Sequence, residues 1–574
     1  MFRHYFRQEG LSRRLIYLIL SLLLGLQLFT YLIYPNLTLI WQTFSPNGHI
    51  DLSVLGKVIS SQRVLGAMKN TFLLAISLCV TVNILGIFQV LCLDYFKIPG
   101  RRFLALAFHA PLVSNRLVLV TAYNFLLGSQ GLVTSALHRY FPGLDPYWFR
   151  GFWPVLLVMT FAGTNNHILF VRDALRSIDY QTVEAAQNMG VRGFRILWKV
   201  LLPTLRPAIF AVSILTFING ISAFAESEIL GAAQFETINP LVRAFSATLN
   251  TRNYAAVLAI FLGFISILVL VIANRIEARR KYNSVSKVKT KLQRQEIKSR
   301  PLRYTLTFLA HLSAWIQLIP LAFILLFSFM PRRALYEGRL RFDLLNLDNY
   351  RRALSSAAGL KPLLTSIVYS ALASLLVLFL ILILARVITK HKNRWTAGLE
   401  LILQVPWFLP STLLALGLVM TFSRPSILTF GLTLGGSIWL LLIGYVVGKI
   451  PYTLRMIKAA YVSIDNSLEE AARNLGAGVL HSYCRVILPI ITPAMLSMFL
   501  LNFISRLAEY SMAVFLFHPL YRPLGVVLSA ANSSDADPQT QMLTFVYAAI
   551  VMLLSILIVG LVYGRKYRQK RRGS

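Results

Sequence analysis

Twelve apolar runs, each of about 20 residues, restrict the fold of this chain more than any other feature. A run of that length crosses a bilayer as a helix, because the hydrocarbon core is roughly 30 Å thick. Hydrophobic residues make up 56% of the 574 residues and charged residues 14%, which fits neither a soluble nor a disordered protein. The sequence therefore predicts an all-α membrane protein with twelve transmembrane helices, at about 15–34, 71–93, 103–127, 152–171, 207–230, 254–273, 304–329, 363–386, 397–421, 433–451, 491–517 and 541–563.

Basic residues lie in clusters between these runs and predict an orientation. The formal net charge is +35, but a nucleic-acid-binding surface needs its charges on one water-facing patch, so we expect no nucleic acid as a partner. Arg13 and Arg14 precede the first run, and RKYRQKRRGS follows the last. Because Lys and Arg mark the cytoplasmic ends of membrane helices, both termini are predicted to be cytoplasmic. The basic segment 331–362, on the predicted outer side, is an exception.

A polar segment, residues 275–303, divides the chain into two units. It carries eleven Lys or Arg against Glu277 and Glu296 and shows no apolar periodicity. This composition is expected of a cytoplasmic linker in water or along anionic headgroups, with a regulatory basic arm as the alternative. We therefore expect a first six-helix half at 1–274 and a second at 304–574. The three cysteines share no spacing that indicates a metal site or a disulfide framework.

The two halves contain matching segments. LRSIDYQTVEAAQNMGVRGFRILWKVLLPTLRPAI (175–209) aligns without a gap on YVSIDNSLEEAARNLGAGVLHSYCRVILPIITPAM (461–495), at a shift of 286 residues from Glu184 to Glu470. Loops change length easily, so a gap-free match of this extent indicates a duplication. Six is an even number of helices, so both halves enter the membrane in the same direction, as a parallel repeat about an axis along the membrane normal.

Each matching segment is predicted to form a short capped helix. An aspartate caps the first backbone N–H groups, a glycine closes the helix in the left-handed conformation, and a proline interrupts helical hydrogen bonding before the next span. These residues are Asp179, Gly190 and Pro203 in the loop 179–207, and Asp465, Gly476 and Pro489 in the loop 465–493. Paired alanines let another surface approach the backbone closely. We interpret the segment as a rigid peg for a partner; the alternative is a capped turn that lies on the membrane.

The pattern resembles the EAA loop of the permease subunits of binding-protein-dependent ABC importers. Its residues are Glu184, Ala185, Ala186, Gly190, Val200, Leu202 and Pro203, and again Glu470, Ala471, Ala472, Gly476, Val486, Leu488 and Pro489. Both copies have valine where isoleucine is commoner in the family. In that family the EAA helix is the coupling helix, which docks in a groove of the ATP-binding subunit. The resemblance implies that these residues couple the membrane part of the protein to an ATPase.

The resemblance also implies partners and a location. Two ATP-binding subunits, expected to be identical and to carry ATP and Mg, would sit below the permease at the cytoplasmic face of a bacterial plasma membrane. A separate extracytoplasmic binding protein would deliver the solute. The sequence agrees on one independent point, because it contains no G-x-x-x-x-G-K-[ST] phosphate loop. We therefore expect a transport subunit with no catalytic residue, cofactor or assigned metal site of its own, and with ATP hydrolysis on a separate chain.

Polar residues inside the predicted spans mark a candidate substrate path, since ionisable groups there are costly and usually face a cavity or a partner. They are Arg116, Asn219, Glu226, Glu228, Asn502, Ser505, Arg506 and Glu509. Counted along continuous helices, the glutamates reach the outer half of the membrane. There they would form an outer gate or the last ligands of a cation path, or else lie at the outer interface or pair with Arg506 or Arg116.

Two further polar groups lie within predicted spans. Arg116 stands beside Pro111, Ser114 and Asn115, which predicts a broken helix whose freed backbone groups line a cavity. Residues 165–167, Asn-Asn-His, are predicted to hydrogen-bond between packed helices.

The solute is the least constrained part of the prediction. Fused twelve-span permeases with this loop occur among importers of iron(III), thiamine and aminoethylphosphonate, and polyamine importers use related unfused subunits. The words LRSIDYQTVEAAQNMG and FETINPLV resemble the iron(III) branch most, and ferric ion prefers oxygen ligands such as Glu226, Glu228 and Glu509. An ion-gradient-driven secondary transporter is the alternative from another class, because parallel six-plus-six repeats also occur there. A membrane enzyme would need a catalytic cluster, which the sequence does not show.

Overall fold

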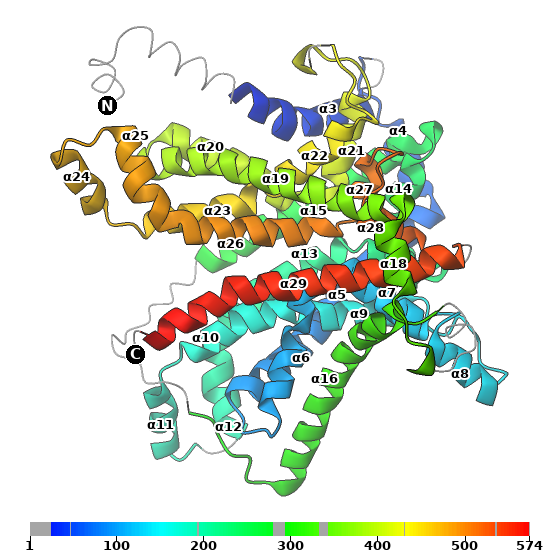
Figure 1. Ribbon diagram of the computed structural model, residues 1–574, viewed down its shortest axis with the longest axis vertical. Helices are drawn as coiled ribbons and strands as arrows, with labels where there is room; N and C mark the ends of the chain where they lie inside the picture. The colour runs from blue at the N-terminus through cyan, green and yellow to red at the C-terminus, as the bar shows by residue number, and fades with distance from the viewer. Residues whose placement is uncertain are drawn as a thin grey trace.

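The computed structural model describes residues 25–572, except 46–47, 192–193, 279–292, 332–341, 430 and 534–535. Within these ranges the chain consists of helices joined by turns (Figure 1), and the pairings of strand type are two isolated bridges, Phe96 with Gln295 and His518 with Tyr521. The all-α fold expected from the apolar runs is therefore confirmed for the described part of the chain.

Helices of the first half precede the predicted linker. They are η1 (Phe29–Ile33), α3 (Tyr34–Phe44), α4 (Ser53–Ser60), α5 (Gln62–Asp94), α6 (Arg101–Val113), α7 (Arg116–Leu127), α8 (Leu132–Tyr140), α9 (Phe152–Gly163), η2 (His167–Val171), α10 (Arg172–Arg176), α11 (Tyr180–Asn188), α12 (Phe194–Ile196), η3 (Leu197–Leu201), α13 (Leu202–Ile221), η4 (Ser227–Gly231), η5 (Ala232–Gln234), α14 (Ile238–Ser246), η6 (Leu249–Thr251) and α15 (Arg252–Ala278).

Helices of the second half follow it. They are α16 (Arg300–Ser328), η7 (Phe342–Leu344), α18 (Asp348–Ser355), α19 (Ala357–Lys390), α20 (Arg394–Phe408), α21 (Ser411–Phe422), η8 (Ile427–Thr429), α22 (Ile438–Val447), α23 (Ile450–Val462), α24 (Asn466–Asn474), α25 (Val479–Ser482), η9 (Tyr483–Ile487), α26 (Leu488–Leu507), α27 (Ala513–Leu516), α28 (Leu524–Ala530) and α29 (Pro538–Arg572). Most of the predicted linker, residues 279–292, lies outside the described residues.

Membrane-spanning helices can be compared directly with the predicted runs. Among the described residues, nine helices are long and apolar enough to cross a membrane, and eleven if each of two bent pairs counts as one span. The bent pairs are α20 with α21, at 104°, and α22 with α23, at 45°. The first predicted span, 15–34, begins in residues that the structure does not describe.

The predicted break in the span 103–127 is confirmed. Helix α6 ends at Val113 and α7 begins at Arg116, and between them the Asn115 side chain accepts a hydrogen bond from the backbone N–H of Leu117 at 3.0 Å. A cap of this kind starts a new helix at the point where the old one ends. The second half is broken at the corresponding place, where Pro410 separates α20 from α21.

The predicted bounds of two spans, 207–230 and 491–517, are wrong at both ends. Continuous helices run instead over Phe194–Ile221 and Val479–Leu507, so the prolines of the matching loops do not separate loop from span. In each copy a π-turn, η3 or η9, precedes the Leu-Pro pair. Its wider ring offers room for the carbonyl group that a proline ring would otherwise meet in the preceding turn.

Both helices also end before the glutamates that were predicted to lie on them. At the end of α13, the Asn239 side chain donates to the backbone carbonyls of Ile221 (3.2 Å) and Ala223 (3.3 Å). After α26, the Glu509 carboxylate accepts the backbone N–H groups of Met512 (2.9 Å) and Ala513 (3.1 Å) and so begins α27. Side-chain hydrogen bonds therefore replace the helical ones at these two breaks.

The two halves are interlocked. Helix α16, which opens the second half, packs against α6 and α7, and α3 of the first half packs against α21 of the second (Figure 1). The largest buried apolar cluster contains Val118 and Val155 from the first half together with Phe327 and Phe545 from the second. One core thus joins both halves.

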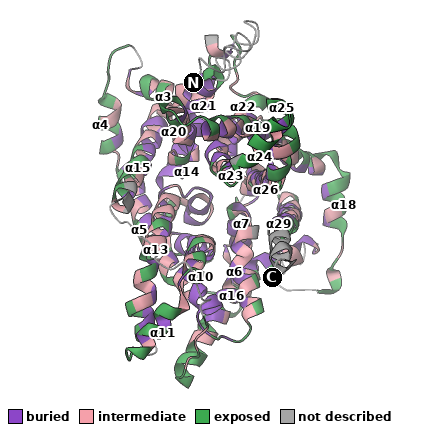
Figure 2. Ribbon diagram, turned by 90° about the vertical axis from the view of Figure 1, so that its left-hand side faces the viewer, coloured by how far each residue is buried: buried purple, intermediate pink, exposed green. Residues whose placement is uncertain are grey.

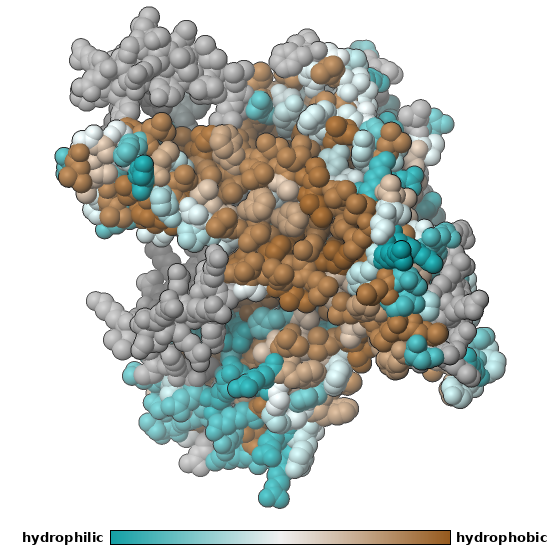
Figure 3. All heavy atoms as spheres, viewed as in Figure 1, coloured by the Kyte–Doolittle hydropathy of each residue, from teal (hydrophilic) through white to brown (hydrophobic). Residues whose placement is uncertain are grey.

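The surface and the ends of the molecule fit a membrane protein. Hydrophobic side chains cover the middle of the face drawn in Figure 3, over α19, α26 and α29, and hydrophilic side chains gather toward the ends. Helices α11 and α24 lie on the same side of the molecule, the left-hand side of Figure 1, with α24 in the upper part and α11 in the lower part. This placement agrees with two halves that enter the membrane in the same direction.

Candidate functional site

Helices α11 and α24 have the caps that the sequence predicts. The Asp179 side chain accepts a backbone N–H two residues further on at 3.1 Å, and Asp465 does the same at 3.0 Å. Gly190 and Gly476 have φ angles of 82° and 81°, in the left-handed region that L side chains rarely adopt. Beyond the adjacent residues of the chain, no atom of the described residues lies within 4 Å of the position that a Cβ would take at either glycine. Glycine is therefore required at these positions by the left-handed backbone conformation and not by a lack of space for a side chain.

Both helices present similar side chains to solvent. The exposed groups are Glu184, Ala185 and Met189 on or after α11, and Glu470, Ala471 and Leu475 on or after α24. Met189 is 77% exposed and Leu475 88%. Large apolar side chains held in the open beside a carboxylate and a small residue form a surface that fits another protein.

The two helices are held to the rest of the molecule by different contacts. Val183 on α11 is fully buried, whereas the aligned residue of α24 is Glu469, which pairs with Arg386, with Lys390 at 2.7 Å and with Arg473 at 3.1 Å. Partial burial alone would raise the pKa of Glu469, but the hydrogen bonds from Lys390 and Arg386 outweigh it and lower the pKa to about 2. Helix α24 is otherwise exposed on nearly all sides (Figure 2).

The end of the predicted linker lies beside α11. The backbone of Gln295 donates to the carbonyl of Tyr95 at 2.8 Å and accepts from the N–H of Lys97 at 3.0 Å. The side chain of Gln187, on α11, reaches that of Gln295 at 3.5 Å. Glu296 forms an exposed ion pair with Lys97 at 2.6 Å. The linker thus supports the first of the two capped helices.

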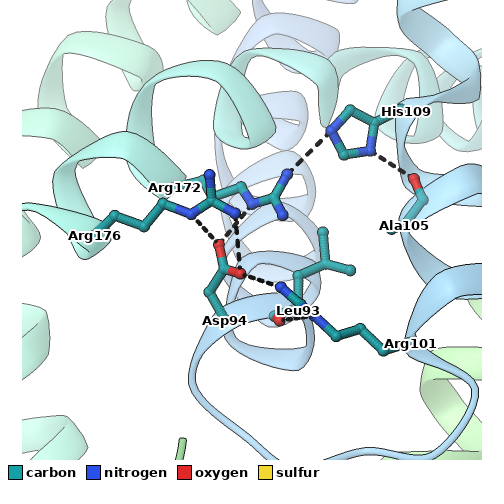
Figure 4. A network of polar contacts seen from close by, with 7 residues as sticks. All are labelled: Leu93, Asp94, Arg101, Ala105, His109, Arg172 and Arg176. Carbon is teal, nitrogen blue, oxygen red and sulfur yellow. Dashed lines mark hydrogen bonds and ion pairs between the residues drawn. The ribbon is translucent and has the colours of Figure 1, made fainter. Parts of the chain in front are cut away.

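A buried carboxylate, Asp94 at the end of α5, joins three elements next to α11 (Figure 4). It is 8% exposed and accepts hydrogen bonds from Arg172 at 2.6 Å, Arg176 at 2.7 Å and Arg101 at 3.0 Å. Arg172 also contacts His109 at 3.0 Å. Because Arg172 and Arg176 lie on α10, which leads directly into α11, this cluster fixes the base of the capped helix to α5 and α6.

A cavity of about 490 Å³ lies between the two halves. From the first half it is lined by the α6–α7 break, by Asn165 and by the segment after α13; from the second half it is lined by the α22–α23 break, by α26 and the segment after it, and by α29. Its polar lining residues are Ser114, Asn115, Arg116, Asn165, Ser222, Glu226, Lys449, Tyr452, Ser505, Glu509, Tyr510 and Ser511. A smaller cavity beside it is lined by Arg116, Asn219 and Glu226 among others.

Three charged side chains of the cavity have no ion pair or hydrogen bond with any residue that the structure describes. They are Arg116, Lys449 and Glu226. Glu226 is the most enclosed of them, at 4% exposure. Glu509, in contrast, is engaged by the two backbone N–H groups that start α27. An enclosed carboxylate without a partner is costly, so the cavity holds unsatisfied charge of both signs.

The predicted path residues divide into two groups. Arg116, Asn219, Glu226, Ser505 and Glu509 line the cavities. The other three, Glu228, Asn502 and Arg506, are not among the lining residues. Their polar groups are used for packing between helices instead, as the contacts of each show.

Glu228 forms an ion pair with Arg243 and accepts a hydrogen bond from Tyr510 at 2.5 Å. Its pairing with Arg506 or Arg116, considered from the sequence, is therefore wrong. Asn502 is fully buried and donates to Thr453 at 2.9 Å. Arg506 lies over the ring of Tyr445, 5.0 Å from its centroid.

The predicted packing role of the 165–167 group holds for His167, which contacts Asn83 at 3.0 Å. Asn165, in contrast, lines the cavity.

Lys449, Tyr452 and Tyr510 are lining residues that the sequence reasoning missed. Lys449 is a charged residue near the end of the apolar run 433–451, followed by a proline two positions later. A charge beside a helix break within a span is the same signal that identified Arg116. The two tyrosines carried no such signal, because aromatic residues are common throughout the spans.

Known proteins resemble this chain over most of its length. A family profile described as "binding-protein-dependent transport system inner membrane component" matches residues 10–282 and 377–566. A probable ABC transporter permease protein, y4fN, of Sinorhizobium fredii is 34% identical over 547 residues, which cover 95% of this chain and 96% of that protein.

Two further relatives have named transport systems. The ferric transport system permease protein FbpB of Actinobacillus pleuropneumoniae is 22% identical over 86% of this chain and 70% of its own length. A putative 2-aminoethylphosphonate transport system permease protein, PhnU, of Salmonella paratyphi A is 27% identical over 43% of this chain and 86% of its own. The profile match and the 34% identity over nearly the full length establish that this chain belongs to the family of inner-membrane components of binding-protein-dependent transport systems, the ABC transporter permeases.

Proposed function

We propose that this chain is the transmembrane permease subunit of an ATP-driven importer and forms the path of a small solute across a bacterial plasma membrane. The observation that carries the proposal is the pair of capped helices, α11 and α24, on the same side of a molecule whose two halves line one cavity. A secondary transporter would have no use for two matched exposed helices of this kind.

Two ATP-binding subunits are proposed to dock on the two capped helices, each receiving one of them in a groove. The coupling residues are Glu184, Ala185, Ala186, Gly190 and Pro203, and Glu470, Ala471, Ala472, Gly476 and Pro489. ATP and Mg would bind on those subunits, and the termini of this chain would face the cytoplasm with them. A binding protein on the other side would deliver the solute to the cavity.

Two solutes have support. Iron(III) is supported by the extent of the match to ferric permeases and by the cavity carboxylates Glu226 and Glu509, since ferric ion prefers oxygen ligands. Aminoethylphosphonate is supported by a different observation, the cations Arg116 and Lys449 that line the same cavity, since such groups bind oxyanions. Thiamine and polyamines have no comparable support.

The proposal is tested with charge-reversal variants of the two exposed glutamates, Glu184→Lys and Glu470→Lys, in cells that contain the chain with its own ATPase. We expect both variants to insert in the membrane, to lose solute uptake and to retain less ATPase on affinity purification. Lys57→Met, on the exposed helix α4, is the control and should behave as the parent. Undiminished uptake by both glutamate variants would contradict the proposal, and gradient-driven transport by the chain alone would favour a secondary transporter.

A further inference from the structure

The class of solute can be inferred from three charged residues of the cavity, Arg116, Lys449 and Glu226. The inference rests on the proposed transport function, because it concerns the site that the solute would pass. Arg116 comes from the first half and Lys449 from the second, so the two cations approach the cavity from opposite sides of the junction. Neither has an ion pair or hydrogen bond with a described residue. The Lys449 ammonium lies 5.7 Å from the centroid of the Tyr452 ring, a contact that leaves its N–H groups able to donate to a ligand.

The backbone adds positive potential at the same place. Arg116 is the first residue of α7, and Lys449 directly precedes α23. Both helices are longer than ten residues, and the N-terminus of a helix carries a partial positive charge. Asn115 already accepts the Leu117 N–H in α7, and Pro451 in α23 has no N–H, so fewer N–H groups are free there than at an uncapped helix. Helices that begin inside a membrane cavity bind anionic groups of solutes in this way. The two breaks thus present two cations and two helix N-termini to one space.

Glu226 supplies the opposite charge. It is 4% exposed, lines both cavities and lacks a partner among the described residues. An enclosed carboxylate of this kind is satisfied by a ligand that brings a positive charge or hydrogen-bond donors. Glu509 contributes less, because the N–H groups of Met512 and Ala513 already occupy its oxygens.

We infer that the cavity binds a small zwitterion, whose oxyanion group lies between Arg116 and Lys449 and whose ammonium group lies against Glu226. A bare trivalent cation is disfavoured, since it would approach two cations that form no ion pair with a described residue and would find one carboxylate, Glu226, that accepts no hydrogen bond from a described residue. A simple anion leaves Glu226 unsatisfied and a simple amine leaves Arg116 and Lys449 unsatisfied. A solute with both groups satisfies all three residues at once.

Saturation-transfer NMR on the full-length chain in nanodiscs tests the inference without an ATPase or a binding protein. The probes are 2-aminoethylphosphonate and β-alanine as zwitterions, methylphosphonate as an oxyanion and ethanolamine as a cation. We expect the zwitterions to bind more tightly than methylphosphonate or ethanolamine. Arg116→Met and Lys449→Met should each weaken zwitterion binding about tenfold or more, as the loss of a charge-assisted hydrogen bond requires.

Glu226→Gln provides the sharper comparison. This variant should weaken zwitterion binding and leave methylphosphonate binding as tight as in the parent or tighter, because the carboxylate that repels an anion is neutralised. Lys57→Met serves as the control, and size-exclusion profiles identify any variant that does not fold. Equal binding of zwitterions by the parent, Arg116→Met and Lys449→Met would overturn the inference. The absence of any zwitterion binding to the parent would overturn it as well. The proposed function is tested by a different measurement, because normal uptake in the Glu184→Lys and Glu470→Lys variants would contradict it without bearing on this inference.

Discussion

At the residue scale, the two glycines that close α11 and α24 show how a single position could be read from the sequence. Each follows a short polar helix that begins with an aspartate cap, and a left-handed residue at that place is usually glycine. The structure gives both a φ near +80° with no neighbouring atoms. Cavity residues were less accessible to this reasoning. Glu226 was predicted from its place in an apolar run, and Lys449 carried the same signal as Arg116, but no local pattern encodes that these residues share one cavity between the halves.

Gly476→Ala tests the backbone requirement. Without crowding, the cost of the Cβ should come from the left-handed conformation alone, about 1 kcal/mol. We expect faster amide hydrogen exchange at the end of α24 and an unchanged melting temperature for the whole chain. Gly398→Ala, at a helical position in α20 that is equally open, is the matched control and should be neutral or slightly stabilising. Equal exchange at α24 in both variants would show that the backbone relaxes without cost.

Glu469→Gln tests the ion pairs that hold α24. The pKa of Glu469 in the folded chain, about 2, lies below its ordinary value of 4.5, so its contribution is present above about pH 4.5 and is lost as the pH falls toward 2. At neutral pH we expect the variant to show exchange about threefold faster in α24, as a solvent-screened pair allows, and no change in α11. The difference between parent and variant should shrink as the pH approaches 2. A pH-independent difference would assign the effect to packing.

At the element scale, the structure divides the predicted span 103–127 into α6 and α7. It also continues two helices, Phe194–Ile221 and Val479–Leu507, through prolines at which the sequence predicted a break. Hydropathy identifies the apolar stretch, because that property is local, but it does not locate the ends. Asn115 and Glu509 set ends by capping, and the π-turns η3 and η9 carry a helix through prolines. The repeat could be predicted from the sequence, because the gap-free match of 175–209 with 461–495 does not depend on how the helices pack.

The variant Asp94→Asn tests whether the Asp94 cluster stabilises the packing of α5, α6 and α10 at the base of α11. The substitution leaves Arg101, Arg172 and Arg176 without their shared carboxylate, and we expect the chain to lose about 2 kcal/mol of stability, because removing one partner of a buried ion pair leaves charge uncompensated. A detergent melt followed by tryptophan fluorescence measures the effect. Glu296→Gln, which breaks the exposed pair with Lys97, is the matched control and should cost roughly 0–1 kcal/mol. Equal melting temperatures for the two variants would mean that the Asp94 ion pairs stabilise the chain no more than the exposed Glu296–Lys97 pair does.

At the scale of the whole molecule, the sequence predicted two parallel halves but not how they interlock. Hydropathy and the positions of charges predict twelve spans and a direction for each, and the described residues contain nine helices that are long and apolar enough to span, or eleven with the two bent pairs. Which helix packs against which depends on side chains that meet only in three dimensions, and so α16 against α6 and α7, or α3 against α21, had no signal along the chain. The same interlocking places the cavity at the junction, with charged residues contributed by both halves.

Interlocking makes the halves dependent on each other, and cutting the chain within residues 279–292 tests this dependence. A first half made alone lacks the packing of α16 on α6 and α7, and a second half made alone lacks the packing of α3 on α21, so each would expose apolar surface that the other half buries. We expect each fragment alone to aggregate on size exclusion in mild detergent. The two fragments made together should co-purify through a tag on either one and elute with the uncut chain, since core packing and not the linker holds them together. A monodisperse first half, with the melting temperature of the uncut chain, would show instead that the halves are independent domains joined only by the linker.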